Sequence, residues 1–300
     1  MIGTGRRVVL GISGHRTSHL VEWAAALARP GDTVRIVHGY RPIPYAATDW
    51  QLPVDDNHLI RKVSERHVLA AAVKLRRARP DITVTSELAG NPAGRVLAEA
   101  ARSADLVMVG APHCDRSRLV LTRLLNEVDC PVVVFGAAEP LLDWPVTALV
   151  RGSQGDEKIL RSAFALAQQR GCGLLVLKPW RPPLDGSAGY AEIAEQKALD
   201  SYLAGIGEFF PDVAVAAELR FGQPLEVLVE HSTIDLLVLG LVRPHLQPGW
   251  LNILLDTVLP AHPYPIMLIP EPGSPSRWLA NDLRSHLTNR VPAERIGEAR

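Results

Sequence analysis

Short apolar runs alternate with helix-like segments along the first half of the chain. Continuous apolar runs are typical of strands that are buried on both faces, as in parallel sheets crossed over by helices. The pattern therefore predicts a parallel α/β sheet. Its strands are expected near residues 7–12, 33–38, 82–88, 105–109 and 131–135.

The segments between these runs have helical periodicity. An apolar stripe recurs at i, i+4, i+7 and i+8 after the first run, so its members share one face of a helix. They are Leu20, Ala24, Leu27 and Ala28. Longer segments at 55–79 and 190–209, rich in Ala, Leu, Lys, Arg and Glu, predict two more helices.

The same order of signals occurs twice. An acidic residue, a short apolar run and a glycine make up 105–110 and again 235–240. A Gly-x-Pro motif precedes each of them, at 90–92 and at 222–224. Self-similarity of this kind indicates a duplicated structural unit. We therefore predict two tandem open, doubly wound domains, each with a five-stranded, mostly parallel sheet.

The predicted domains cover residues 1–140 and 141–271, and a linker, short helix and tail follow at 272–300. Pro92 and Pro224 suit the first turn of a helix, where the missing N–H has no partner. Two other prolines, Pro131 and Pro265, begin the last strand of each unit, and proline at a strand start suits a sheet edge.

Composition excludes several classes of protein. The 32 basic residues balance 32 acidic ones, so no net field holds the chain on nucleic acid or on an acidic membrane. Three cysteines cannot form a disulfide framework, which favours a reducing cytoplasm. No apolar run approaches the roughly 20 residues of a membrane span.

Ligands of doubly wound sheets bind at the carboxyl ends of the strands. The candidate pocket residues are those that follow the predicted strands. In the first unit they are Ser13, Gly14, His15, His38, Gly90, Gly110 and His113. In the second unit they are Arg151, Gly152, Ser153, Lys178, Gly222, Gly240 and Arg243. We expect no catalytic residue and no metal ligand among them.

Two chemical alternatives follow from these residue types. His15, His38 and His113, with Cys114 and Asp115, are suited to a transition metal, but 113–115 are adjacent in sequence and rarely point to one centre. In the second unit Arg151, Lys178, Arg181 and Arg243 could hold an anion. These cations are otherwise solvated or paired with acids such as Asp185.

The chain resembles the universal stress proteins in their tandem form, over residues 6–137 and 145–270. The resemblance rests on five features in the same order in each unit: the strand into a glycine turn, an aromatic-Arg-Pro, the Gly-x-Pro, the Asp-apolar-Gly strand, and the Cys-Pro or Tyr-Pro that opens the fifth strand. It implies Rossmann-like domains, similar to adenine-nucleotide alpha-hydrolases, that pair through their fifth strands within one chain. Further homodimerisation stays open.

Nucleotide-binding members of that family carry an Asp after the first strand and a Gly-x2-Gly-x9-Gly-Ser/Thr loop after the fourth. Here Ser13 stands at the first Asp position, and Arg151 or Gly152 at the second. After Gly110 the loop spacing falls on His113, and after Gly240 it falls on Arg243. Side chains at glycine positions strain the backbone or block the ligand, so we expect the family's ATP binding to be lost in both domains.

The resemblance therefore implies a non-enzymatic, cytoplasmic stress-response protein that binds a small ligand or a protein partner, without nucleic acid, membrane or cofactor. Two alternatives stay open: an ATP-binding, weakly hydrolysing protein, and a metal-binding or enzymatic site in the first pocket.

Overall fold

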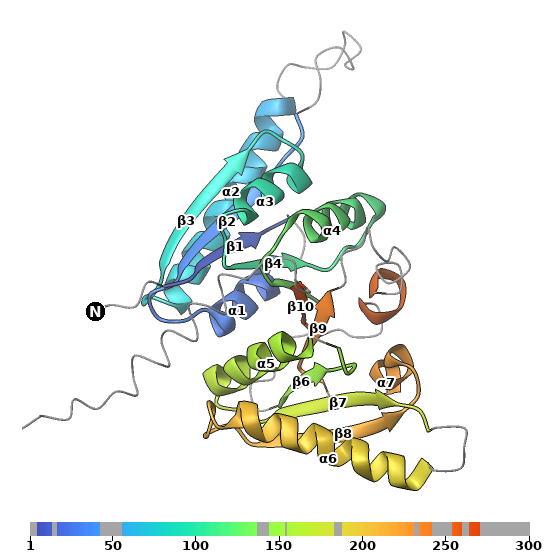
Figure 1. Ribbon diagram of the computed structural model, residues 1–300. Coiled ribbons are helices and arrows are strands. Elements are labelled where there is room, and N and C mark those ends of the chain that lie inside the picture. The colour runs from blue at the N-terminus through green and yellow to red at the C-terminus, as the bar shows by residue number, and fades with distance from the viewer. Residues whose placement is uncertain are drawn as a thin grey trace, which may run out of the picture.

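The strands of the protein form a single sheet in the computed structural model (Figure 1). The structure describes residues 5–13, 17–42, 56–136, 144–153, 155–182, 188–230, 234–241, 254–259 and 264–270. The predicted C-terminal linker, helix and tail at 272–300 lie outside the described residues, as do Gly14, His15 and Arg243.

The first half of the chain, residues 5–136, contributes five parallel strands in the order β3-β2-β1-β4-β5. They are β1 (Arg7–Gly11), β2 (Thr33–Gly39), β3 (Thr83–Ala89), β4 (Leu106–Gly110) and β5 (Val132–Phe135). All five strands predicted for this half are confirmed. The apolar runs located them because the middle strands are buried on both faces.

The second half, residues 144–270, repeats this arrangement in the order β8-β7-β6-β9-β10, again with parallel neighbours. Its strands are β6 (Val146–Leu149), β7 (Leu174–Trp180), β8 (Val215–Phe221), β9 (Leu236–Leu241) and β10 (Ile266–Pro270). The order of the strands is therefore duplicated along the chain, as the sequence motifs are.

Helices cover both faces of the sheet. One face packs against α1 (Thr17–Leu27), α2 (Asp56–Ala78), α5 (Asp156–Arg170) and α6 (Ala188–Gly207). The other packs against α3 (Ala93–Ala101), α4 (Asp115–Glu127), α7 (Pro224–Glu230) and the short π-helix η2 (Leu254–Val258). Among the helices in these ranges, none combines the length and the apolarity that crossing a membrane requires.

The two halves of the sheet meet at β5 and β10, which pair in the antiparallel sense with Met267 opposite Val133. Pro131 and Pro265 directly precede these strands, and their carbonyl oxygens accept hydrogen bonds of 3.0 Å from Val107 and Leu237. Each of these strands is the edge of its own five-stranded half, as expected, and the two edges pair with each other. The sheet ends instead at β3 and β8.

The helix-start prolines differ from each other. Pro224 is the first residue of α7, as predicted. Pro92 lies one position earlier than predicted, at the N-cap of α3, with an extended ψ of 130°. An extended backbone at the N-cap is usual, because that residue has not yet entered the helix.

Candidate functional site

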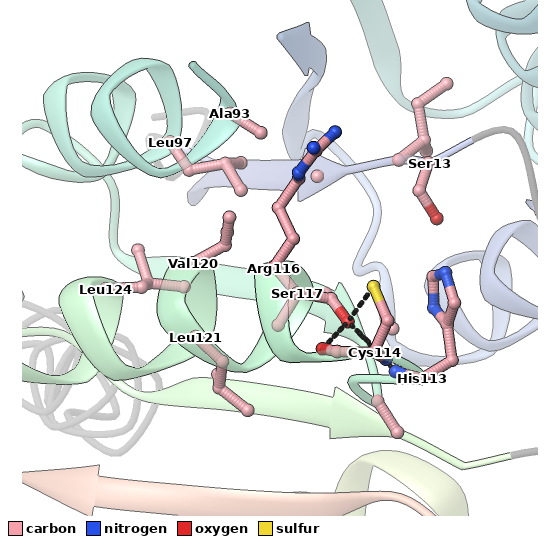
Figure 2. A pocket seen from close by; sticks show the side chains of 15 residues that line it. Ser13, Ala93, Leu97, His113, Cys114, Arg116, Ser117, Val120, Leu121 and Leu124 are labelled. Atoms are coloured by element: carbon pink, nitrogen blue, oxygen red, sulfur yellow. Dashed lines mark hydrogen bonds between the residues drawn. The ribbon is translucent and has the colours of Figure 1, made fainter. Parts of the chain in front are cut away.

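A cavity of about 310 Å³ opens at the carboxyl ends of β1 and β4, between α3 and α4 (Figure 2). Its walls come from both strands, both helices and the segment that joins β4 to α4. The lining residues are Gly11, Ile12, Ser13, Ala93, Leu97, Val109, Gly110, Ala111, His113, Cys114, Arg116, Ser117, Val120, Leu121 and Leu124. This position is where doubly wound sheets hold their ligands.

The interior of this cavity is apolar. Leu97 projects from α3 toward α4, and Val120 projects from α4 toward α3 (Figure 2). A Cβ on Gly11 would lie 2.5 Å from Leu97 Cδ2, so the bare glycine of β1 is what lets this leucine pack against the strand. Hydrocarbon walls of this kind favour an apolar ligand surface.

The polar groups gather around the start of α4. Ser117 Oγ accepts hydrogen bonds from the backbone N–H groups of His113, at 2.9 Å, and Cys114, at 3.1 Å, and donates to Cys114 O at 2.8 Å. Only residues 111–114 separate β4 from α4. The N–H groups of His113 and Cys114, which could otherwise contribute to a phosphate cradle, are therefore already engaged by a side chain of the protein.

Cys114 lines the same cavity with an exposed side chain, and its Sγ lies 3.4 Å from Ser117 Oγ. The hydrogen bond with Ser117 lowers the pKa of the Cys114 thiol. Cys130 behaves oppositely, because burial raises the pKa of its thiol to about 12. Cys130 is buried just before β5.

Three of the candidates from the first half, Ser13, Gly110 and His113, line the cavity. They also line an adjoining cavity of about 320 Å³ that extends to Phe135. His38 lies outside both linings, and its Nδ1 is 2.8 Å from Ile12 O.

Gly90 also lies outside both cavities, and a Cβ on it would approach Tyr40 Oη to 3.3 Å. The metal alternative gains no support from the part of the chain that the structure describes, where no group of three His, Cys, Asp or Glu side chains is placed to hold an ion.

Sequence reasoning missed the residues of the first helical turn and beyond, namely Arg116, Ser117, Val120, Leu121 and Leu124. The predicted candidates were only the residues that directly follow the strands, so they did not include residues of the next helix. The available signal was the helix start itself, because residues at i, i+3, i+4 and i+7 of a helix that begins at a strand end share one face.

In the second half, the candidate residues after β6 surround a carboxylate of the protein itself. The backbone N–H groups of Arg151, Gly152 and Ser153 donate to Asp156 Oδ2 at 3.0, 2.6 and 3.0 Å. Ser153 Oγ donates to Asp156 Oδ1 at 2.9 Å. Gly152 has a φ of +78°, which only glycine adopts readily, and this conformation turns the three amides toward one point.

The other second-half candidates are engaged within the fold. Lys178 forms an ion pair with Glu195 of α6. Asp185, the acid named for these cations, lies outside the described residues. Gly240 lies inside β9, where it pairs with Ile269. Gly222 has a φ of +129° at the entry to α7, where Gln223 N donates to Glu226 Oε2 at 2.6 Å.

Comparisons with known proteins agree with this architecture. A model of the Universal stress protein family matches residues 5–136. The chain is 30% identical over 258 residues to Universal stress protein Rv2623 of Mycobacterium tuberculosis, covering 78% of this chain and 85% of that protein. It is 28% identical over 277 residues to a universal stress protein of Mycolicibacterium smegmatis, covering 84% and 91%.

Among solved structures, the crystal structure of a universal stress protein from Archaeoglobus fulgidus superposes with a TM-score of 0.65. The match covers 89% of this chain and 97% of that one, at 13% sequence identity, and so establishes a shared fold.

Proposed function

The chain belongs to the universal stress protein family, and from that premise we propose a cytoplasmic, non-enzymatic protein that acts in a stress response by binding a small ligand. The ligand site is the cavity between α3 and α4. A protein partner is the second kind of ligand that fits the proposal. No catalytic residue, metal or cofactor is part of it.

One observation carries the proposal that the family's ATP binding is lost in the first half. Ser117 Oγ accepts hydrogen bonds from the backbone N–H groups of both His113 and Cys114, and these two residues belong to the four-residue connection between β4 and α4. A triphosphate needs several free backbone donors close together, as a glycine-rich loop supplies. Ser13 at the end of β1 also lacks the carboxylate with which nucleotide-binding relatives hold the nucleoside.

The second half supports the same proposal by a different route. The amides of residues 151–153 converge on one point, as they would around an anion, but Asp156 already supplies the negative charge there. A ligand phosphate would have to displace a carboxylate that is 4% exposed and accepts four hydrogen bonds.

We further propose that residues 1–140 and 141–271 are two domains that pair within one chain. The antiparallel pairing of β5 with β10 supports this arrangement, as does the hydrogen bond of 2.7 Å from Arg29 Nε to Gln169 Oε1. A size measurement in solution then reports whether two such chains associate further.

The experiment that tests the function is native mass spectrometry of the full chain purified from its own host, followed by calorimetric titration with ATP, AMP and cyclic AMP. We expect a bound small molecule and no ATP binding at micromolar concentration. Micromolar ATP binding overturns the proposed loss and favours the alternative, an ATP-binding member of the family.

A pair of variants on α4 assigns any bound molecule to the cavity. Val120 lines it, so Val120→Trp fills the space and is expected to abolish the bound mass. Leu119, its neighbour, is 71% exposed and lies outside the lining, so Leu119→Trp is the matched control and keeps the bound mass. Equal occupancy in both variants contradicts the assignment.

A further inference from the structure

One cation of the cavity, Arg116, has no carboxylate partner among the described residues. Arg116 lines the cavity with an exposed side chain, and its guanidinium makes no hydrogen bond or ion pair with the residues that the structure describes. Its charge also contributes, after the hydrogen bonds of Ser117, to lowering the pKa of the Cys114 thiol. Two other arginines of α4 are paired, Arg118 with Asp256 and Arg123 with Glu127.

The free guanidinium lies beside the apolar space. Figure 2 shows the Arg116 side chain rising from the first turn of α4 toward the level of Ala93 on α3, across the opening between the two helices. An anion bound there would accept a bidentate pair of charge-assisted hydrogen bonds from the Arg116 guanidinium. It would also lie near the positive end of the α4 dipole.

The deeper surface of the cavity favours a ligand with one negative charge. Its deeper walls are hydrocarbon, from Leu97, Val120 and Leu124, and these side chains cannot solvate a second charged group. Asp115, the acidic residue of the first turn, does not line the cavity and so does not neutralise Arg116 from within it. A chain of phosphates would leave most of its charge unpaired.

We propose that this cavity binds a small monocarboxylic acid with a hydrocarbon body. The carboxylate lies against Arg116, and the hydrocarbon packs on Leu97, Val120 and Leu124. The volume of about 310 Å³ is at the small end of the range of ligand pockets, about 300–1,000 Å³, which suits a short or medium chain. This inference rests on the proposed function, because it names the ligand class of the same cavity.

The test compares two probes of equal chain length, octanoate and 1-octanol, by calorimetric titration into the full chain. We expect octanoate to bind about tenfold more tightly than 1-octanol at low salt, with the difference shrinking as salt screens the charge. Arg116→Gln is expected to reduce octanoate binding to the level of the alcohol and to leave 1-octanol binding unchanged. Arg123→Gln, on the same helix, is the control and changes neither.

Cys114 supplies a second readout, because its thiol lines the same cavity. Bound octanoate is expected to slow the alkylation of Cys114 by iodoacetamide in the wild type, and Val120→Trp is expected to remove this protection.

The outcomes separate the two proposals. Equal binding of both probes, or octanoate binding that Arg116→Gln does not weaken, overturns the acid class while the ligand cavity stands. Octanoate binding that survives Val120→Trp also overturns it, because the site then lies elsewhere. If neither probe binds, the acid class is overturned too. The proposed ligand cavity fails in a different experiment: the protein purified from its host would carry no bound molecule that Val120→Trp displaces.

Discussion

Arg118 of α4 and Asp256 of η2 form an ion pair across 138 residues of sequence. Through this pair, the helix that forms one wall of the cavity in the first half also contacts the second half. The same helix therefore presents one face to the candidate ligand and another to the second half of the chain.

The Arg118 guanidinium holds the pKa of the Asp256 carboxyl below its ordinary value, through their hydrogen bond. We expect Arg118→Gln to return the Asp256 pKa to the usual range of about 4. Carboxyl-detected NMR titration of Asp256 measures this shift. Arg123→Gln removes a charge from the same helix but leaves the pair intact, so an equal shift in that variant would contradict the assignment.

The same pair makes stability depend on pH. Because the folded-state pKa of Asp256 is depressed, its contribution is fully present above the unfolded value of about 3.9 and is lost as pH falls through the folded value. The stability difference between wild type and Arg118→Gln should therefore be constant from pH 5 to 8 and shrink below about pH 4. Urea unfolding across this range, at low and high salt, measures it, and salt should reduce it.

Cys114 is expected to be the fast-reacting thiol of the folded protein. Ser117 lowers its pKa, whereas burial raises that of Cys130 to about 12. Iodoacetamide at pH 7 should modify Cys114 first and leave Cys130 unmodified until the protein unfolds. Mass spectrometry of timed samples identifies each site.

Ser117→Ala should raise the pKa of Cys114 and so reduce the thiolate fraction near neutral pH. The alkylation rate should fall at pH 7 and match that of the wild type above the ordinary thiol pKa of about 8.5. A variant rate that is unchanged at pH 7 would show that the Ser117 hydroxyl does not stabilise the thiolate.

Asp156 is expected to be a major local determinant of stability in the second half. Asp156→Ala leaves the amides of residues 151–153 without their acceptor and should cost about 2–3 kcal/mol in the free energy of unfolding. Asp156→Asn keeps one oxygen acceptor and should cost less. Asp115→Ala, at the first turn of α4, is the matched control and should cost about 0.5 kcal/mol.

Gly39 lies where β2 passes α3. A Cβ at this position would lie 2.6 Å from Ala93 Cα and 2.9 Å from Asn91 O, so backbone must move to admit it. Gly39→Ala should cost about 1–3 kcal/mol by urea unfolding. Gly110→Ala is the control, because nothing lies within 4 Å of its added Cβ, and its cost should stay within about 0.5 kcal/mol.

The strands were predictable because their signal is local. A buried strand must carry consecutive apolar residues wherever its neighbours lie, so 33–38 and 105–109 were identified without knowledge of their partners. Loop length is local too, and the missing glycine spacing after Gly110 agrees with a connection to α4 of only four residues. Of the pocket candidates in the first half, Ser13, Gly110 and His113 line the cavity.

Other features depend on residues that are distant in sequence or on backbone conformation. Lys178 pairs with Glu195 because α6 packs over β8, the strand beside β7, and no spacing rule selects that acid among the others. Asp156 accepts three amides only because Gly152 has a positive φ. The lining from α4 follows from how that helix packs against α3.

The sequence by itself determined two copies of one α/β unit, the position of every described strand of the first copy, and the departure from the family's glycine-rich loop spacing. Those features depend on periodicity and spacing along the chain. Only the tertiary structure decided that Asp156 accepts the amides of residues 151–153 and that Arg116 faces an apolar cavity. The backbone conformation at Gly152 decides the first, and the packing of α4 against α3 decides the second; the order of apolar and polar residues along the chain specifies neither.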